Sequence, residues 1–171
     1  MTVNPDDAGK TLNDQIMICA RDVGWRLTAQ AWLPAPIEAV FGFFADASNL
    51  QSLTPARLKF QILTPQPLEM QEGTRIDYRL RLFGFPFTWT SEISKWQPCV
   101  EFVDRQVRGP YRHWQHRHGF ERSSTGTLVI DEVDYSVPGG RLAHCLFVRR
   151  NLVKIFRYRL EKLRERFPNP R

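Results

Sequence analysis

The sequence PGGRLAHCLFVRRNLVKIFRYRLEKLRERFP, residues 138–168, marks the point at which the hydrophobic pattern of the chain changes its period. Pro138-Gly139-Gly140 ends a region of alternating residues, and large apolar side chains then recur at steps of three and four. This apolar stripe comprises Val148, Leu152, Ile155, Phe156, Leu160, Leu163 and Phe167. The spacing predicts one amphipathic helix about 30 Å long, which Pro168 terminates.

The region before Pro138 alternates apolar and polar residues, which is typical of half-buried strands. The pattern is clearest in residues 75–82, where Arg and Asp alternate with Ile, Tyr and Leu. We expect about seven strands, at residues 25–33, 58–63, 75–82, 87–93, 102–107, 111–120 and 127–137. Because short turns containing Gly or Pro connect consecutive strands, the sheet is predicted to be an antiparallel meander.

Two short helices are expected after the first strand. Pro36 suits the first turn of a helix, and Ile37, Val40, Phe41 and Phe44 follow at helical spacing. Residues 49–54 predict a second helix, closed by a proline. This element order is that of an α+β helix-grip fold, in which a curved antiparallel sheet wraps around the long C-terminal helix. Unless large side chains fill the space between sheet and helix, that space is a cavity.

The composition indicates one globular domain. The chain has 171 residues, of which 42% are hydrophobic and 25% are charged. Residues 1–22 lack a sustained period and are predicted to form a flexible tail, followed by one ligand-binding domain at residues 23–171. Cys19, Cys99 and Cys145 have neither disulfide-framework nor zinc spacing, which favours the reducing cytoplasm. No apolar run reaches the length of a membrane span.

The net charge of +6 is concentrated at the C-terminal end. Residues 141–171 hold ten Arg or Lys and two Glu, whereas the other residues hold 14 basic and 16 acidic groups. A solvated helix face explains this distribution, and an anionic membrane or acidic partner is the alternative. The basic and aromatic residues of 111–118 fall largely on opposite faces of a strand, so no nucleic-acid partner is expected.

Short motifs occur along most of the chain. They are LPAP at 33–36, VF at 40–41, Phe44, NL at 49–50, LTP at 53–55, GTRIDY at 73–78, FVDRQ at 102–106, RGPY at 108–111, Trp114, His116, His118 and Phe120. These motifs resemble the SRPBCC superfamily, the START/Bet v1-like proteins, over residues 25–167. The later ones resemble a bacterial branch that includes stand-alone SRPBCC proteins and similar domains fused to sugar-nucleotide-epimerase-like units.

The resemblance implies a fold that binds hydrophobic ligands such as lipids, sterols or polyketides. Some branches of the superfamily are cyclases, aromatases or ring hydroxylases. This sequence has no catalytic motif specific to one of those enzymes, and neither a Rieske cluster pattern nor an epimerase domain. We therefore expect no cofactor and no bound metal.

The alternation of the strands indicates which side chains face inward. An apolar cavity wall is expected from Phe44, Tyr78, Leu80, Trp89, Phe102, Trp114, Phe120 and Phe156. The same parity turns a polar set inward, namely Asp104, Gln106, His116, His118, Asp131 and Tyr135. The polar set has three interpretations: a buried hydrogen-bond network, a group that orients a ligand, or a site of acid–base or metal chemistry. In the third, His116, His118 and Asp131 are the candidate catalytic residues.

Arg159 interrupts the apolar stripe of the C-terminal helix. A buried guanidinium needs an anion, so we expect it to pair with Asp104 or Asp131, the acidic residues that parity places inside. Contact with a ligand anion, or extension of the long side chain to solvent, are the alternatives.

Three functions follow from these patterns. The main hypothesis is a non-catalytic carrier or sensor of a small hydrophobic ligand. The second is a cyclase- or dehydratase-like enzyme that uses the His/Asp wall. The third is an accessory module that docks on an anionic membrane or acidic protein through its basic C-terminal helix.

Overall fold

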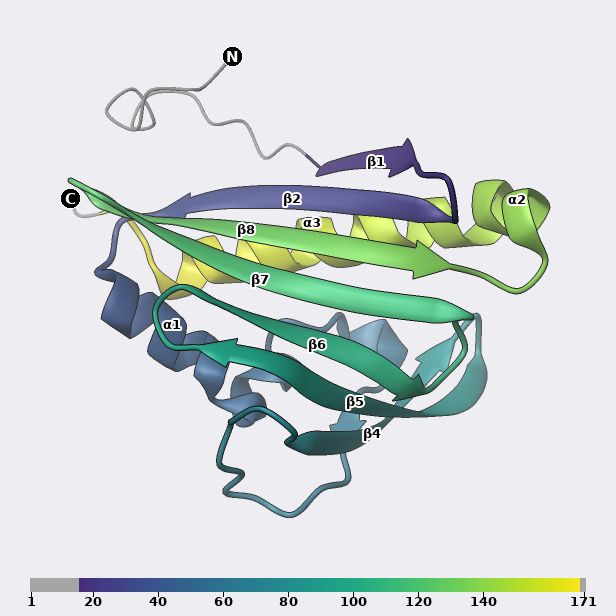
Figure 1. Cartoon of the computed structure of the whole chain (residues 1–171), viewed down its shortest axis with the longest axis horizontal. Coiled ribbons are helices and arrows are strands. Elements are labelled where there is room, and N and C mark those ends of the chain that lie inside the picture. Colours follow the sequence, from purple (N-terminus) through teal and green to yellow (C-terminus); the bar gives the residue numbers. More distant parts are fainter. Residues whose placement is uncertain (1–15, 170–171) are drawn as a thin grey trace.

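A computed structural model describes residues 16–169 of the chain. The described part forms one antiparallel sheet of eight strands in the order β1-β2-β8-β7-β6-β5-β4-β3, and a long helix, α3, crosses behind β2, β8 and β7 (Figure 1). The strands are β1 (Ile16–Ala20), β2 (Trp25–Leu33), β3 (Gln61–Ile62), β4 (Arg75–Leu82), β5 (Phe85–Gln97), β6 (Glu101–Arg108), β7 (His113–Ser123) and β8 (Gly126–Ser136). The helical elements are α1 (Ile37–Ala45), η2 (Ala47–Gln51), η3 (Ala56–Leu58), α2 (Gly140–Ala143), η4 (His144–Val148) and α3 (Arg149–Arg166). The predicted α+β helix-grip fold is confirmed.

Strand β1 lies within the segment that the sequence analysis assigned to a flexible tail. It pairs with β2 in the register Ile16↔Ala29 to Ala20↔Trp25. Ile16 and Ile18 pack against the core, which gives the strand an apolar side. Gly24 closes the connecting turn at φ +81°, where a Cβ would lie 2.2 Å from the carbonyl oxygen of Tyr135. Residues 1–15 of the predicted tail lie outside the described residues.

The strand expected at residues 58–63 is reduced to the two residues of β3. Leu58 instead ends the 3-10 turn η3, and Lys59 follows in the left-handed region at φ 46°. Extended backbone can begin only after that residue. The second short helix is the 3-10 turn η2, two residues earlier than expected because the Asp46 side chain accepts a hydrogen bond from the Ser48 backbone N–H at 2.9 Å.

The C-terminal helical segment is interrupted by one π-helical turn, η4, between α2 and α3. In this turn His144 is buried, stacks on Trp25 at 3.8 Å between ring centroids, and lies 3.0 Å from the Tyr135 hydroxyl. The turn therefore docks the start of the helical segment on β2 and β8. Among the described helices, none has both the length and the apolarity to cross a membrane.

Helix α3 packs against the sheet along its apolar stripe. Leu152 and Phe156 contact the apolar residues of β2 and β8, whereas Leu160 and Leu163 join the cluster that contains α1. Strand β8 is buried at every second position, so its inward face carries Asp131 among valines as the alternation predicts. The helix is thus fixed against both halves of the core.

Arg159 forms an ion pair with Asp131 beneath this helix. Arg159 is 6% exposed, and its Nε donates to Asp131 Oδ2 at 3.0 Å, while Nη2 donates to Oδ1 at 3.4 Å. The guanidinium also lies 5.0 Å from the centre of the Phe44 ring. The predicted pairing with Asp104 or Asp131 is confirmed, and Asp131 is the partner.

Replacing Arg159 with Met should lower the free energy of unfolding by about 3–5 kcal/mol, because the Asp131 carboxylate would stay buried without its ionic partner. Chemical denaturation followed by tryptophan fluorescence measures the loss. Arg157→Met is the matched control, since Arg157 is exposed on the same helix. That variant should change stability by less than about 0.5 kcal/mol. Equal stability of the two variants would contradict the anchoring role.

Candidate functional site

A cavity of about 200 Å³ lies between the sheet and α3. Its wall is mainly apolar and includes seven of the eight apolar side chains that were expected there, together with others. The expected members are Phe44, Tyr78, Leu80, Trp89, Phe102, Trp114 and Phe156. Leu53, between η2 and η3, Leu58 in η3, and Phe60 and Met70 after it also line the cavity, although the sequence pattern did not predict them. These residues lie in irregular backbone, where no period reveals the facing side.

One side of the cavity is an aromatic wall on β4, β5 and β7. Trp89 lies 5.8 Å from Tyr78 and 5.3 Å from Trp114, between ring centroids. The Trp89 indole N–H donates to Ser91 Oγ at 3.0 Å, and the Tyr78 hydroxyl lies 3.0 Å from the same oxygen. Burial, and then the charge of Asp104, raise the pKa of Tyr78 well above its usual value. The wall therefore presents neutral polar groups that are already hydrogen-bonded. Sequence reasoning missed Ser91, although it shares the parity of Trp89.

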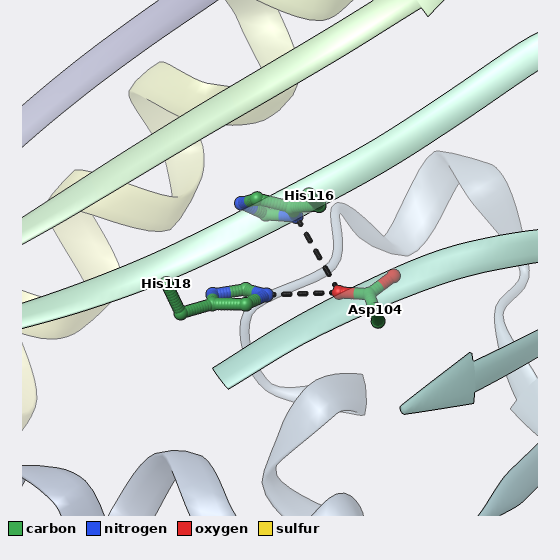
Figure 2. A group of neighbouring side chains, drawn as sticks. All are labelled: Asp104, His116 and His118. Carbon is green, nitrogen blue, oxygen red and sulfur yellow. Dashed lines mark hydrogen bonds and ion pairs between the residues drawn. The ribbon is translucent and has the colours of Figure 1, made fainter. Parts of the chain in front are cut away.

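A second, polar part of the cavity wall is formed by His116 and His118 on β7 and Asp104 on β6. Figure 2 shows both imidazole rings directed toward the Asp104 carboxylate. His118 Nε2 lies 2.9 Å and His116 Nδ1 lies 3.9 Å from Asp104 Oδ2. The two imidazole rings are 3.7 Å apart between centroids, and Phe102 stacks on His118 at 4.1 Å. Cross-strand pairing of Asp104 with His116 fixes this arrangement through the backbone.

Asp131 lies behind the two histidines and does not line the cavity. Its Oδ1 is 2.9 Å from His116 Nε2 and 3.0 Å from His118 Nδ1. Arg159 contacts the same carboxylate, and its Nη2 is 3.2 Å from His118 Nδ1. The two histidines therefore stand between a cavity-facing carboxylate and a fully enclosed one. We use the name His/Asp cluster for Asp104, His116, His118, Asp131 and Arg159.

The pKa shifts in this cluster follow from burial and charge. Burial opposes ionisation of Asp131, but the Arg159 charge and the hydrogen bonds from His116 and His118 hold its pKa well below the usual value. Burial also opposes ionisation of Asp104, while the hydrogen bond from His118 and the charge of His116 bring its pKa below the usual value. Burial, and then His118, lower the pKa of His116. Both carboxylates are thus ionised in the folded protein near neutral pH, and His116 favours its neutral form.

Besides Asp131, three side chains that were expected at the ligand site lie outside the cavity wall. Gln106 donates through Nε2 to the Tyr111 backbone oxygen at 2.8 Å and so holds the turn between β6 and β7. Phe120 packs edge-on against Phe44 on α1 at 5.2 Å between ring centroids. Tyr135 is buried against His144. Each of them faces inward, but a neighbouring element covers it.

Solved structures with the same fold include a protein of Chromobacterium violaceum, which is 14% identical to this chain with a TM-score of 0.66. The similarity covers 85% of this chain and 98% of that protein. The major latex-like protein 151 of Panax ginseng is 12% identical with a TM-score of 0.62, and the similarity covers 84% of this chain and 97% of that protein. A nucleoside-diphosphate sugar epimerase of Corynebacterium glutamicum is 23% identical over 81% of this chain, with a TM-score of 0.58, but only 28% of that protein is covered. No curated protein matches the sequence significantly.

A family model described as polyketide cyclase / dehydrase and lipid transport matches residues 33–163. The match covers most of the chain and runs from the end of β2 into α3. It agrees with the helix-grip architecture and with the SRPBCC resemblance of the sequence motifs. The protein therefore belongs to the polyketide cyclase / dehydrase and lipid transport family.

Proposed function

We propose that the protein binds a small hydrophobic ligand in its cavity and acts as a carrier or sensor of that ligand. The observation that supports this proposal is the mainly apolar wall with one polar cluster at its side. Apolar surface supplies the affinity in such a site, and a few polar groups fix the orientation of the ligand. The family also supports a fold that binds hydrophobic ligands.

The His/Asp cluster favours recognition over catalysis. His118 contacts carboxylates through both ring nitrogens, and His116 Nε2 is hydrogen-bonded to Asp131. His116 Nδ1 lies 3.9 Å from Asp104 Oδ2, beyond hydrogen-bond distance. A cyclase- or dehydratase-like reaction would have to use this nitrogen or open one of the other contacts on ligand binding. Mass spectrometry of a bound ligand before and after incubation separates the two functions, because a carrier releases its ligand unchanged.

Filling the cavity should weaken ligand binding without loss of the fold. Leu80→Trp places a larger ring in the wall, and we expect affinity for an environment-sensitive apolar dye to fall by at least about tenfold, which corresponds to ~1.4 kcal/mol. Ile155→Trp fills the cavity from α3 and serves as a second variant. Fluorescence titration measures the affinities.

Leu63→Trp is the control for this experiment, because Leu63 is 39% exposed and does not line the cavity. It should bind the dye like the wild type. Unchanged affinity in both cavity variants, with cooperative thermal melting retained, would contradict ligand binding at this site.

An exposed apolar patch supports docking on an anionic membrane as a second function. Leu142, Leu146 and Phe147 on α2 and η4 are 55–71% exposed. Phe83, in the turn between β4 and β5, contacts Phe147 at 5.9 Å between ring centroids. We name these four residues, with the exposed Phe85, the apolar patch.

The surroundings of the apolar patch favour a lipid surface. Leu82, which directly precedes Phe83, lines the cavity, so the patch lies beside the ligand site. Arg141, Arg149 and Arg150 are exposed in the same helical segment. Apolar side chains flanked by arginines fit a bilayer of acidic lipids, from which a hydrophobic ligand could be taken.

Removing the apolar patch should weaken association with vesicles that contain phosphatidylglycerol. The double substitution of Phe83 and Phe147 by Ser should reduce binding by at least about tenfold, since a buried Phe contributes roughly 1.5–3 kcal/mol. Reversal of Arg150, Lys154 and Arg157 to Glu should also weaken binding, and that attraction should fall with added salt. Val107→Ser, an exposed change on β6, is the control. Equal sedimentation of all variants with vesicles would contradict docking.

A further inference from the structure

The cavity-facing part of the His/Asp cluster gathers three metal-ligating side chains around one point. The ligand atoms of Asp104, His116 and His118 all lie within 4.8 Å of one another. Figure 2 shows that one nitrogen of each ring points to the same carboxylate oxygen. All three side chains line the cavity. A small cation at this point would therefore contact the protein on one side and the cavity on the other.

In each ring, the nitrogen that points away from Asp104 faces the Asp131 carboxylate. His116 Nε2 and His118 Nδ1 lie 2.9 and 3.0 Å from the same oxygen, Asp131 Oδ1. An ionised carboxylate only accepts hydrogen bonds, so His116 Nε2 carries the hydrogen of its ring and His116 Nδ1 offers a lone pair toward Asp104. His118 Nδ1 also lies 3.2 Å from Arg159 Nη2, which is a donor. His118 Nε2 offers a lone pair toward Asp104 in the tautomer whose Nδ1–H donates to Asp131, and a metal ion at Nε2 would select that tautomer.

This arrangement leaves a deficit of positive charge. Three acceptors converge on one point, and the cluster holds two carboxylates against the single guanidinium of Arg159. A buried negative charge requires a compensating cation. A cation between the ligand atoms of Asp104, His116 and His118 would supply this compensation from the cavity side.

We propose that Asp104, His116 and His118 bind one divalent transition-metal ion, with His116 Nδ1, His118 Nε2 and the Asp104 carboxylate as ligands. Two imidazoles and one carboxylate suit ions such as Zn²⁺, Co²⁺ or Fe²⁺. Asp131 orients His116 by accepting its Nε2–H, and it lies 3.0 Å from His118 Nδ1, where it would accept the N–H of a metal-bound ring, as the outer partners of metal-binding histidines do. Arg159 neutralises Asp131 from the side of α3. The remaining coordination positions face the cavity, where an oxygen of the bound ligand would complete the shell.

The distances agree with such a site. Ligand atoms about 2.1 Å from a tetrahedral metal lie about 3.4 Å from one another. The observed separations from Asp104 Oδ2, 2.9 Å to His118 Nε2 and 3.9 Å to His116 Nδ1, bracket this value. Small side-chain rotations would equalise them, while the pairing of β6 with β7 holds the backbone in place. This site goes beyond the proposed binding of a hydrophobic ligand and does not depend on it.

The test is metal titration of the full chain, free of affinity tag and stripped with a chelator. Calorimetry with Zn²⁺ should give one equivalent of bound metal per chain. Co²⁺ should produce visible absorption bands from nitrogen and oxygen coordination. The His116→Gln and Asp104→Asn variants should lose the one-to-one complex. Asp131→Asn should weaken it by about 10–100-fold, because the rings lose their orientation.

His113→Gln is the matched control, since His113 is exposed on the same strand but on its outer face. It should retain one equivalent of metal. Thermal melting of each variant checks the fold, and Asp104→Asn, which preserves the shape of the side chain, answers the question if His116→Gln fails to fold. Absence of one-to-one binding in the wild type, or its retention in both Asp104→Asn and His116→Gln, would overturn the proposal. Dye binding in the same samples reports separately on the hydrophobic-ligand site.

Discussion

The ion pair between Arg159 and Asp131 joins the two layers of the molecule. Arg159 lies in the apolar stripe of α3 and Asp131 in the apolar face of β8, so each charge would be buried alone without the other. Because removal of either partner leaves an uncompensated charge, the pair penalises every arrangement in which the helix shifts along the sheet. Packing at both ends of α3 and this pair in the middle hold the helix over the sheet, and the cavity is the space that remains.

Much of this architecture could be predicted from the sequence, because the alternation of its strands and the three-to-four-residue spacing of its C-terminal helix are both clear. Alternation along β4, β7 and β8 identified the inward faces, and the break in the helical stripe at Arg159 identified a buried charge with few possible partners. Parity also placed Asp104, His116 and His118 on one side of the sheet. These inferences depend only on which way a side chain points, which is a local property of regular backbone.

The short strands and the exact outline of the cavity could not be predicted, because they depend on contacts between segments that are distant in the sequence. Strand β1 has five residues, too few for a clear alternation, and β3 has two. Phe120 and Tyr135 face inward like the cavity residues, but α1 covers the first and the π-helical turn η4 covers the second. Parity gives the direction of a side chain, whereas the curvature of the sheet and the path of the helices decide whether it meets a cavity or the core.

The pairing of Arg159 also bears on the kind of ligand that the cavity accepts. Two donor nitrogens of the guanidinium are directed at Asp131, so the charge is balanced by the protein itself. Asp131 lies behind the histidines, whereas Asp104, His116, His118 and Arg159 line the cavity. A bound molecule would therefore meet a guanidinium whose charge Asp131 already balances. The ligand therefore need not carry an anion to make burial of Arg159 favourable. A neutral molecule would fit the cavity if one of its oxygens lay near the His/Asp cluster and its apolar part packed against the aromatic wall.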